Sequence, residues 1–460
     1  MIDRYTLPPM RRLWGRKRAK FLFWLKVELA VLWARTRLGE LPKEAYHAIA
    51  RHARVNVKRI EELEADFDHD LIAFVVSVQE SLRAAGVGKY AEEFHRGMTS
   101  YDTEDPALVL MLCQAVNFDL SALRDLELAL REKAEEHKWT LMMMRTHGQD
   151  AEPSTFGHLL LVYALAVRRS INRLEWVFEH ELSEGKISGA VGSYAGVNLT
   201  RECVALEHLG LEAAVAETQI LQRDRFAMVL SVIATAGATI EQMARTFWEM
   251  MRSDARWLEE PRRLKQRGSS AMPGKKNPIL TEREQGMARL LRGYAHTAME
   301  NVATPEGRDI SQSSVERVIL PDATAYLHYM ATKAAGLVRR LVVFPDRMRR
   351  YVEVTSFGVW AGQRVRNALM DAGVKYDPAY LCVQAASFEA VEREVHLAKM
   401  LASRRLSVRS RRTVESVLGR VKLNQCFDAM TYIQPGIEHI FSRAATAFQE
   451  PVPDSIGTTA

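Results

Sequence analysis

The chain has 460 residues, of which 47% are hydrophobic and 26% charged, as in an ordinary globular protein rather than a disordered or fibrous one. Its formal net charge of +6 is small for this length and argues against a dedicated binder of polyanions. Its 25 glycines and 15 prolines are few for this length, which argues against a turn-rich all-β architecture. The four cysteines lie far apart without a CxxC pair, so they predict neither a zinc site nor a disulfide framework and suit a reducing cytosol.

The N-terminus shows no secretory signal, because Asp3 lies among its first residues and no clean apolar segment precedes the basic stretch 11–20. The longest uncharged apolar stretch, 226–240, is shorter than the roughly 20 residues that a bilayer crossing needs. We therefore expect a cytoplasmic protein that does not contact a membrane.

Apolar residues recur with a helical period along most of the chain. The first apolar face runs over residues 21–33 and is followed by Gly39, a helix stop signal. A second helix is predicted to begin at residues 105–106, where proline at the first helical position loses no hydrogen bond, and to continue to about residue 137. Further long helices are predicted over 154–184, 226–257 and 321–343.

Alternating β-type runs are nearly absent, so we predict an all-α protein built around a long central helical bundle. The length suggests about three structural units. Breaks in composition separate an N-terminal helical domain (1–100), the central bundle (101–355) and a C-terminal helical domain (356–460). The tail from Glu450 is predicted to be disordered.

One segment departs from the helical pattern. Residues 268–278 read Gly-Ser-Ser-Ala-Met-Pro-Gly-Lys-Lys-Asn-Pro and lie between two long predicted helices. Hydroxyl, ammonium and amide groups on a mobile backbone suit a lid that closes over an anion. A basic surface turn has the same composition, and composition alone does not decide between the two.

The order of residues in this segment resembles the signature loop of the fumarase/aspartase superfamily, GSSxMPxKxNP, at every fixed position. Other segments are most similar to the adenylosuccinate lyase branch and occur in the same order, from Arg4 to the helices past Phe357. They are 4–6, 69–70, 99–100, 145–149, 189–192, 218–219, 222–225 and 308–317. The resemblance implies β-elimination of fumarate from adenylosuccinate to give AMP, and from the succinyl-aminoimidazole-carboxamide ribotide of purine biosynthesis.

The resemblance also implies catalytic roles. Ser269 matches the general base, which acts as an alkoxide, and Lys275 and Asn277 match groups that hold the succinyl carboxylate on which charge develops. A serine can serve as base only in an electropositive pocket without water, which loop closure would supply. His147 matches the general acid, and Glu282 matches the carboxylate that orients this histidine. Without the surrounding motif, His147 would be an ordinary histidine at a helix start.

Further matches concern binding. His69 matches a second histidine that assists near the leaving group, and Asp70 follows it as in the family. The positions that match other substrate-binding residues are His95, Thr99, Ser100 and Gln219 toward the succinyl end, and Arg4, Tyr5, Arg283, Arg308, Ser313 and Arg317 toward the nucleotide. Arginine forks with nearby hydroxyls suit a phosphate. A Thr-Ser pair is otherwise a common helix cap, and most arginines are solvated helix charges.

Four positions depart from the adenylosuccinate lyase pattern: Asp68, Asp150, Phe226 and Gln312. None removes an implied catalytic group, but together they leave the identity of the leaving amine open. One alternative is a fumarate-releasing lyase for another N-succinyl amine, such as an argininosuccinate-type or specialised biosynthetic enzyme. The other is a catalytically silent scaffold protein.

Family membership would also imply a homotetramer whose long helices form a shared bundle, with active sites built from three subunits. It implies a small nucleotide substrate and no cofactor, and no His, Asp or Glu spacing indicates a required metal. The basic clusters at 11–20 and 404–412 lack groove-reading partners, so we expect solvated helix faces or subunit contacts and no nucleic-acid binding.

Overall fold

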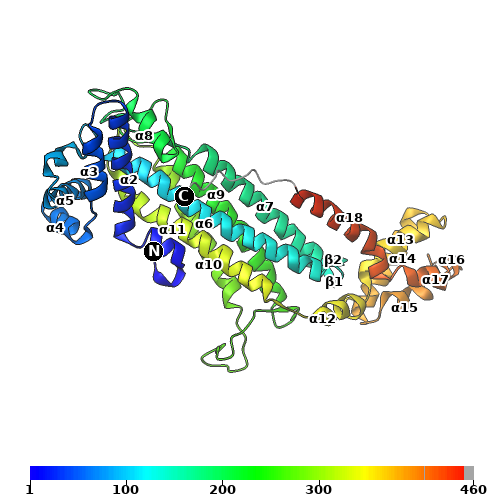
Figure 1. The fold of residues 1–460 in the computed structure, drawn as a ribbon. Coiled ribbons are helices and arrows are strands. Elements are labelled where there is room, and N and C mark those ends of the chain that lie inside the picture. Colours follow the sequence, from blue (N-terminus) through cyan, green and yellow to red (C-terminus); the bar gives the residue numbers. More distant parts are fainter. Residues whose placement is uncertain (409, 450–460) are drawn as a thin grey trace. The chain divides into compact units, whose positions relative to one another are not determined.

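The computed structural model describes residues 1–408 and 410–449 (Figure 1). The predicted disordered tail from Glu450, and Arg409 of the second basic cluster, lie outside these residues. Within them helices dominate, and the strands form only two-stranded sheets. The predicted all-α class is confirmed.

The described chain divides into two compact units. The first comprises 1–125, 167–242 and 283–334, and the second comprises 126–166, 243–282 and the residues from 335 onward. Long helices contribute residues to both units. They are α6 (Ser100–Glu136), α7 (Phe156–His180), α9 (Asp224–Met250), α10 (Ile279–Glu300) and α11 (Ser311–Arg339). The predicted division into three domains stays a prediction.

The predicted long helices exist, but several of their ends were wrong. Helix α6 begins at Ser100 and contains Pro106. The Asp102 carboxylate caps this start by accepting from the Thr99 N–H at 3.0 Å. The proline removes only one intrahelical hydrogen bond, and the helix continues through it. Helix α11 likewise begins before Pro321 and contains it. Proline was therefore a wrong marker for the first residue of both α6 and α11. Helix α7 begins at Phe156 because the residues before it belong to a strand.

The rest of the first unit gathers around α2, which confirms the helix predicted over 21–33. Its elements are η1 (Asp3–Tyr5), α1 (Pro8–Leu13), α2 (Lys17–Arg37), α3 (Lys43–His52), α4 (Val57–Phe67), α5 (Asp70–Ala84), η2 (Gly88–Glu93), α8 (Arg201–Leu209) and the paired strands β3 (Glu184–Gly185) and β4 (Glu212–Ala213). Helix α2 lies beside α8 (Figure 1). Phe21 and Trp24 of α2 pack on Phe74 of α5, with ring centroids 5.9 and 5.5 Å away.

The second unit holds a hairpin that the sequence patterns did not reveal. Strand β1 (Leu141–Thr146) pairs antiparallel with β2 (Gln149–Thr155). The other elements are β5 (Leu258–Glu259) paired with β6 (Val342–Val343), α12 (Pro345–Arg350), η3 (Tyr351–Thr355), η4 (Val359–Ala361), α13 (Gly362–Asp371), α14 (Tyr376–Glu392), α15 (Leu397–Ala402), α16 (Val414–Leu418), α17 (Arg420–Gln425) and α18 (Ala429–Gln449). The C-terminal helices share a core that includes Leu369, Val383 and Leu401.

Helices α6 and α9 are long and apolar enough to span a bilayer by length and composition alone. Of the most apolar window of each, 61% and 56% is buried inside the protein. Because the core helix of a soluble protein passes the same test, these two helices are weak evidence for a membrane span.

Candidate active site

The signature loop, residues 268–278, connects β5 to α10 in the second unit. Its two ends approach so closely that a Cβ added at Gly268 would lie 2.0 Å from the Lys275 carbonyl oxygen. The Asn277 Nδ2 donates to the Gly268 carbonyl at 3.1 Å between the same two ends. Glycine is therefore required at position 268, and the contact between the ends closes the loop that carries Ser269, Lys275 and Asn277.

Ser269 is half-buried, and its Oγ accepts hydrogen bonds from two backbone N–H groups, those of Ala271 (3.3 Å) and Met272 (3.0 Å). Donors aimed at an oxygen favour its negatively charged form. A serine that bonds the backbone two and three residues ahead is also a common local turn. The role of Ser269 as the alkoxide base stays a prediction.

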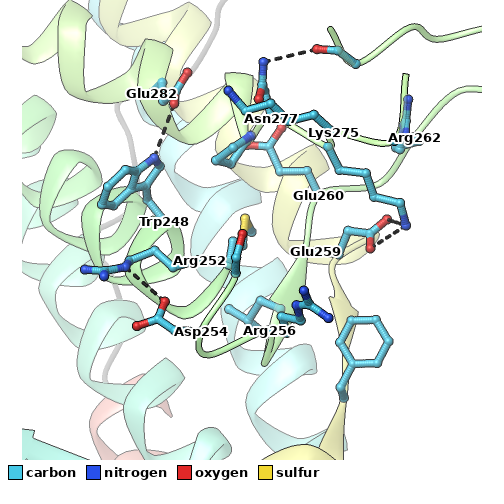
Figure 2. A pocket seen from close by; sticks show the side chains of 18 of the residues that line it. Trp248, Arg252, Asp254, Arg256, Glu259, Glu260, Arg262, Lys275, Asn277 and Glu282 are labelled. Atoms are coloured by element: carbon cyan, nitrogen blue, oxygen red, sulfur yellow. Dashed lines mark hydrogen bonds and ion pairs between the residues drawn. The ribbon is translucent and has the colours of Figure 1, made fainter. Parts of the chain in front are cut away.

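A cavity of 960 Å³ lies beside the loop in the second unit (Figure 2). Lys275, Asn277 and Glu282 are among its lining residues, whereas Ser269 and His147 are not. Positive charge is in excess, because six basic residues and four acidic ones line it. These are Arg252, Arg256, Arg262, Lys275, Lys276 and Arg347, with Asp254, Glu259, Glu260 and Glu282. Such a lining suits a dicarboxylate.

Two of the acidic residues in this cavity have structural partners. Glu259 accepts from the Lys276 Nζ at 2.7 and 2.8 Å, and Glu260 accepts from the backbone N–H groups of Leu280 and Thr281 at the start of α10. No ion pair involves Lys275 among the described residues, so its ammonium is available to an anion.

Glu282 is exposed on the first turn of α10, and its Oε1 accepts from the Trp248 Nε1 at 3.3 Å (Figure 2). The structure thus shows Glu282 beside a tryptophan. Its pairing with His147 stays a prediction.

His147 occupies the turn between β1 and β2. Thr146 pairs with Gln149, so His147 and Gly148 form a two-residue loop, and both have positive φ (55° and 75°). This is the conformation of a type I′ turn, where Asn-Gly is the usual choice. A histidine held there with its side chain exposed is typical of a functional role rather than a packing role.

Arg145 and Asp150 flank this turn. Their contact explains Asp150, one of the four positions that depart from the adenylosuccinate lyase pattern. The Arg145 Nε donates to the Asp150 carboxylate at 3.1 Å, and the guanidinium lies 4.7 Å from the centre of the Trp257 ring. The negative charge that Asp150 adds is therefore neutralised within the hairpin.

In the first unit, three predicted residues form a chain of hydrogen bonds. The Arg308 Nη1 donates to the Gln219 Oε1 at 3.0 Å, and the Gln219 Nε2 donates to the Thr99 Oγ1 at 3.5 Å. Arg308 also lies 4.0 Å from the centre of the Tyr101 ring. Ser100 begins α6 beside Thr99.

Thr99 is held by a buried ion pair. The Asp102 carboxylate accepts from the Thr99 N–H at 3.0 Å, from the Gly189 N–H at 3.2 Å and from the Lys186 Nζ at 2.6 Å. The side chains of Asp102 and Lys186 are each 1% exposed. Because breaking a buried pair leaves an uncompensated charge, this clamp fixes the 99–100 and 189–192 segments relative to each other.

The two other predicted histidines, His69 and His95, each contact another group of the protein through Nδ1. The His69 Nδ1 caps α5 by accepting from the Ile72 N–H at 3.4 Å, so in the neutral ring the hydrogen sits on Nε2, which can donate. The His95 Nδ1 lies 2.7 Å from the Glu28 carboxylate. Burial opposes protonation of His95, but Glu28 outweighs burial and raises the pKa of this histidine above 6.5.

The N-terminal residues form a separate group. The Tyr5 ring meets the Tyr329 ring edge-on at 5.4 Å, the Arg283 Nη1 donates to the Tyr329 hydroxyl at 2.8 Å, and the Arg283 guanidinium lies 5.6 Å from the Tyr5 ring centre. Arg4 is exposed on η1.

Arg317 and Ser313 lie on the first turns of α11 and line a second cavity, of 350 Å³. The Arg317 Nη2 donates to the Asp70 Oδ2 at 2.9 Å. Glu104 lines the same cavity, and burial raises the pKa of its carboxyl to about 7, with the Asp70 carboxylate adding to the shift.

Glu104 predicts a pH dependence of stability. Because its pKa of about 7 in the folded protein exceeds its ordinary 4.5, the folded protein binds more protons than the unfolded chain between these values. The free energy of unfolding therefore falls as pH rises from 4.5 to 7, and the penalty is complete only above pH 7. Glu104→Gln should raise the free energy of unfolding at about pH 8 by about 3 kcal/mol, and by much less near pH 5. Denaturant unfolding of both proteins at the two pH values measures this, and an equal gain at both would contradict it.

The comparisons with known proteins agree on one family of lyases. A family model described as "Lyase" matches residues 4–293. Adenylosuccinate lyase of Bacillus subtilis (strain 168) is 40% identical over 447 residues, which cover 97% of this chain and 100% of that protein. Those of a Synechocystis species and Thermotoga maritima are 40% and 38% identical, each covering 96% of this chain and 99% of the relative.

The chain belongs to the adenylosuccinate lyase family of the fumarase/aspartase superfamily.

Solved structures agree on the fold of this lyase. A fumarate lyase from Mesorhizobium sp. BNC1 superposes with a TM-score of 0.85 at 23% identity, covering 97% of this chain and 99% of that one. The 3-carboxy-cis,cis-muconate lactonizing enzyme from Pseudomonas putida gives 0.84 at 25% identity, covering 97% and 98%.

The remaining departures in this lyase have local explanations. Gln312 is fully buried and donates from Nε2 to the Tyr101 hydroxyl at 3.2 Å. Phe226 is 2% exposed, with the Arg223 guanidinium 5.2 Å from its ring centre. Asp68 ends α4 with a φ of 51°, a left-handed conformation that aspartate tolerates better than most residues.

Sequence reasoning assigned no site role to several residues of the first unit that lie beside the predicted ones: Lys20, Tyr101, Glu104 and Arg223. Lys20 was predicted only as part of a solvated basic cluster. Arg223 is 2% exposed and bonds Asp105 through both Nη atoms, at 3.0 and 2.9 Å. No spacing pattern marks such partners, because they lie far apart in the chain.

Proposed function

We propose that this lyase eliminates fumarate from adenylosuccinate to give AMP, and from the succinyl-aminoimidazole-carboxamide ribotide in the same way. The observation that carries the proposal is about 40% identity to adenylosuccinate lyases over nearly the whole chain, with the signature loop complete. The neutralised Asp150 removes one reason for preferring another amine.

In the proposed reaction Ser269 removes the proton from the carbon beside a succinyl carboxylate. Lys275 and Asn277 stabilise the charge that grows on this carboxylate. The carbon–nitrogen bond then breaks as the carbon–carbon double bond forms, and His147, oriented by Glu282, protonates the departing nitrogen. The elimination is redox-neutral, so it needs no redox cofactor.

Binding is proposed to divide between two groups of residues. Thr99, Ser100, Gln219 and His95 serve the succinyl end, with the 2.6 Å Lys186–Asp102 ion pair holding Thr99 in place. His69 assists catalysis near the leaving group. The nucleotide end is served by Arg4, Tyr5, Arg283, Arg308, Ser313 and Arg317. Tyr5 and Arg283 share Tyr329 as a partner, which supports their acting together.

We also propose a cytoplasmic homotetramer with composite active sites. Large apolar side chains stay exposed on long helices of the first unit, including Trp176 (47%), Met228 (42%), Leu290 (46%) and Met299 (54%). Exposed apolar surface of this kind is typical of subunit interfaces. The four cysteines are free thiols, as expected in a reducing compartment.

Ultraviolet detection of fumarate tests the proposal. Purified protein is given adenylosuccinate, argininosuccinate and aspartate separately. Fumarate should appear with adenylosuccinate and not with the other two. Release from argininosuccinate or aspartate alone would identify a different amine, and no release from any of them would favour a silent scaffold. Activity should also fall on dilution to concentrations at which the tetramer dissociates.

A further inference from the structure

Two cations share one carboxylate beside the 350 Å³ cavity. The Asp70 Oδ2 accepts from the Lys20 Nζ at 2.8 Å and from the Arg317 Nη2 at 2.9 Å. Asp70 is the first residue of α5, and its side chain is 11% exposed. Burial alone would raise the pKa of this carboxyl, but the two cations outweigh burial and lower it, so Asp70 is ionised.

The two cations differ in how firmly they are held. The Lys20 Nζ lies 4.3 Å from the centre of the Trp24 ring and 5.3 Å from that of Phe21, and both aromatic residues are buried in the first unit. The Arg317 side chain is 54% exposed, against 35% for Lys20. Lys20 is therefore the fixed partner of Asp70, and Arg317 is the partner that can turn away.

We propose that Lys20 is a positioning residue for nucleotide binding, which keeps Asp70 neutralised when Arg317 leaves it for the phosphate. This inference rests on the proposed function. It gives Asp70 an indirect role, because its carboxylate holds both cations, at 2.8 and 2.9 Å.

The electrostatic reason is the charge left behind. If Arg317 turned toward a phosphate and Lys20 were absent, Asp70 would remain as a largely buried anion without a cation, close to a second anion. Arg317 would then stay on Asp70, and the nucleotide would bind to fewer groups. With Lys20 in place, Asp70 keeps a charge-assisted hydrogen bond at 2.8 Å throughout.

Lys20→Met tests this role, because methionine keeps an apolar stem against Trp24 and loses the charge. We expect the Ki of AMP and the KM of adenylosuccinate to rise on the order of tenfold. The Ki of fumarate, which lacks the nucleotide, should stay unchanged, and kcat should change by less than about twofold. Lys20→Arg should restore nucleotide binding.

A matched control is Lys26→Met. Lys26 lies on the same helix, is exposed and is not among the residues that line the 350 Å³ cavity, so its loss should leave all four quantities unchanged. Thermal unfolding checks that the variants fold. Lys20→Gln replaces Lys20→Met if that variant does not.

A double mutant separates positioning from direct contact. In the Asp70→Asn background the charge that Lys20 neutralises is gone, so adding Lys20→Met should change the Ki of AMP by less than about threefold. A full tenfold loss there, or a parallel rise in the Ki of AMP and fumarate in Lys20→Met alone, would overturn the inference. Failure of the wild-type protein to release fumarate would instead overturn the proposed function, and AMP binding by calorimetry still reports on Lys20.

Discussion

Replacing Ser269 with alanine is expected to lower kcat by about 10³-fold or more, because Ser269 is the group that takes the proton from carbon in the proposed reaction. The Ser269 Oγ accepts from the Ala271 and Met272 N–H groups, at 3.3 and 3.0 Å, and these donors would stabilise its alkoxide. Steady-state release of fumarate from adenylosuccinate measures the loss.

Binding serves as the control for this variant. The methyl group of alanine fits where serine was, and Lys275 and Asn277 remain, so the dissociation constants of AMP and fumarate should stay within about threefold of wild type. If Ser269→Ala retained wild-type kcat, another residue would be the base. If it lost binding and turnover together, Ser269 would act in loop structure rather than in proton transfer.

The fold was predictable to the extent that helical periodicity reports burial. The long helices were predicted, but α6 begins at Ser100 and α11 at Ser311, before Pro106 and Pro321. A proline is compatible with a helix start and, where packing offsets its cost, with a helix interior, so its presence does not locate the first residue. The β1–β2 hairpin was not predicted because its turn, His147-Gly148, lacks the usual Asn-Gly signal.

The candidate site was predictable only where residues are contiguous in a motif. The signature loop and the 145–149 segment could be read directly from the sequence. The partners that hold these groups could not, because Lys186 clamps Asp102 across 84 positions and Arg317 pairs with Asp70 across 247. Such pairs depend on how helices pack, and each member alone looks like an ordinary surface charge.

Replacing His147 with glutamine is expected to lower kcat by about 10²- to 10⁴-fold, as for loss of a general acid. Glutamine keeps a polar side chain in the exposed hairpin turn, so the variant should fold like the wild type, which circular dichroism and thermal unfolding check. The loss should shrink for a substrate analogue whose leaving group needs no proton. An equal loss on such an analogue would mean that His147 acts in binding rather than as an acid.

Mixing the two inactive variants tests whether His147 and Ser269 of one active site come from different subunits. In a tetramer reassembled at random from equal amounts of His147→Gln and Ser269→Ala chains, each site draws its serine and its histidine independently. About a quarter of the sites then hold both native residues, so about a quarter of wild-type activity should return. If one chain supplied both residues, every site would lack one of them and no activity would return. Recovery on mixing therefore distinguishes a composite site from a site within one subunit.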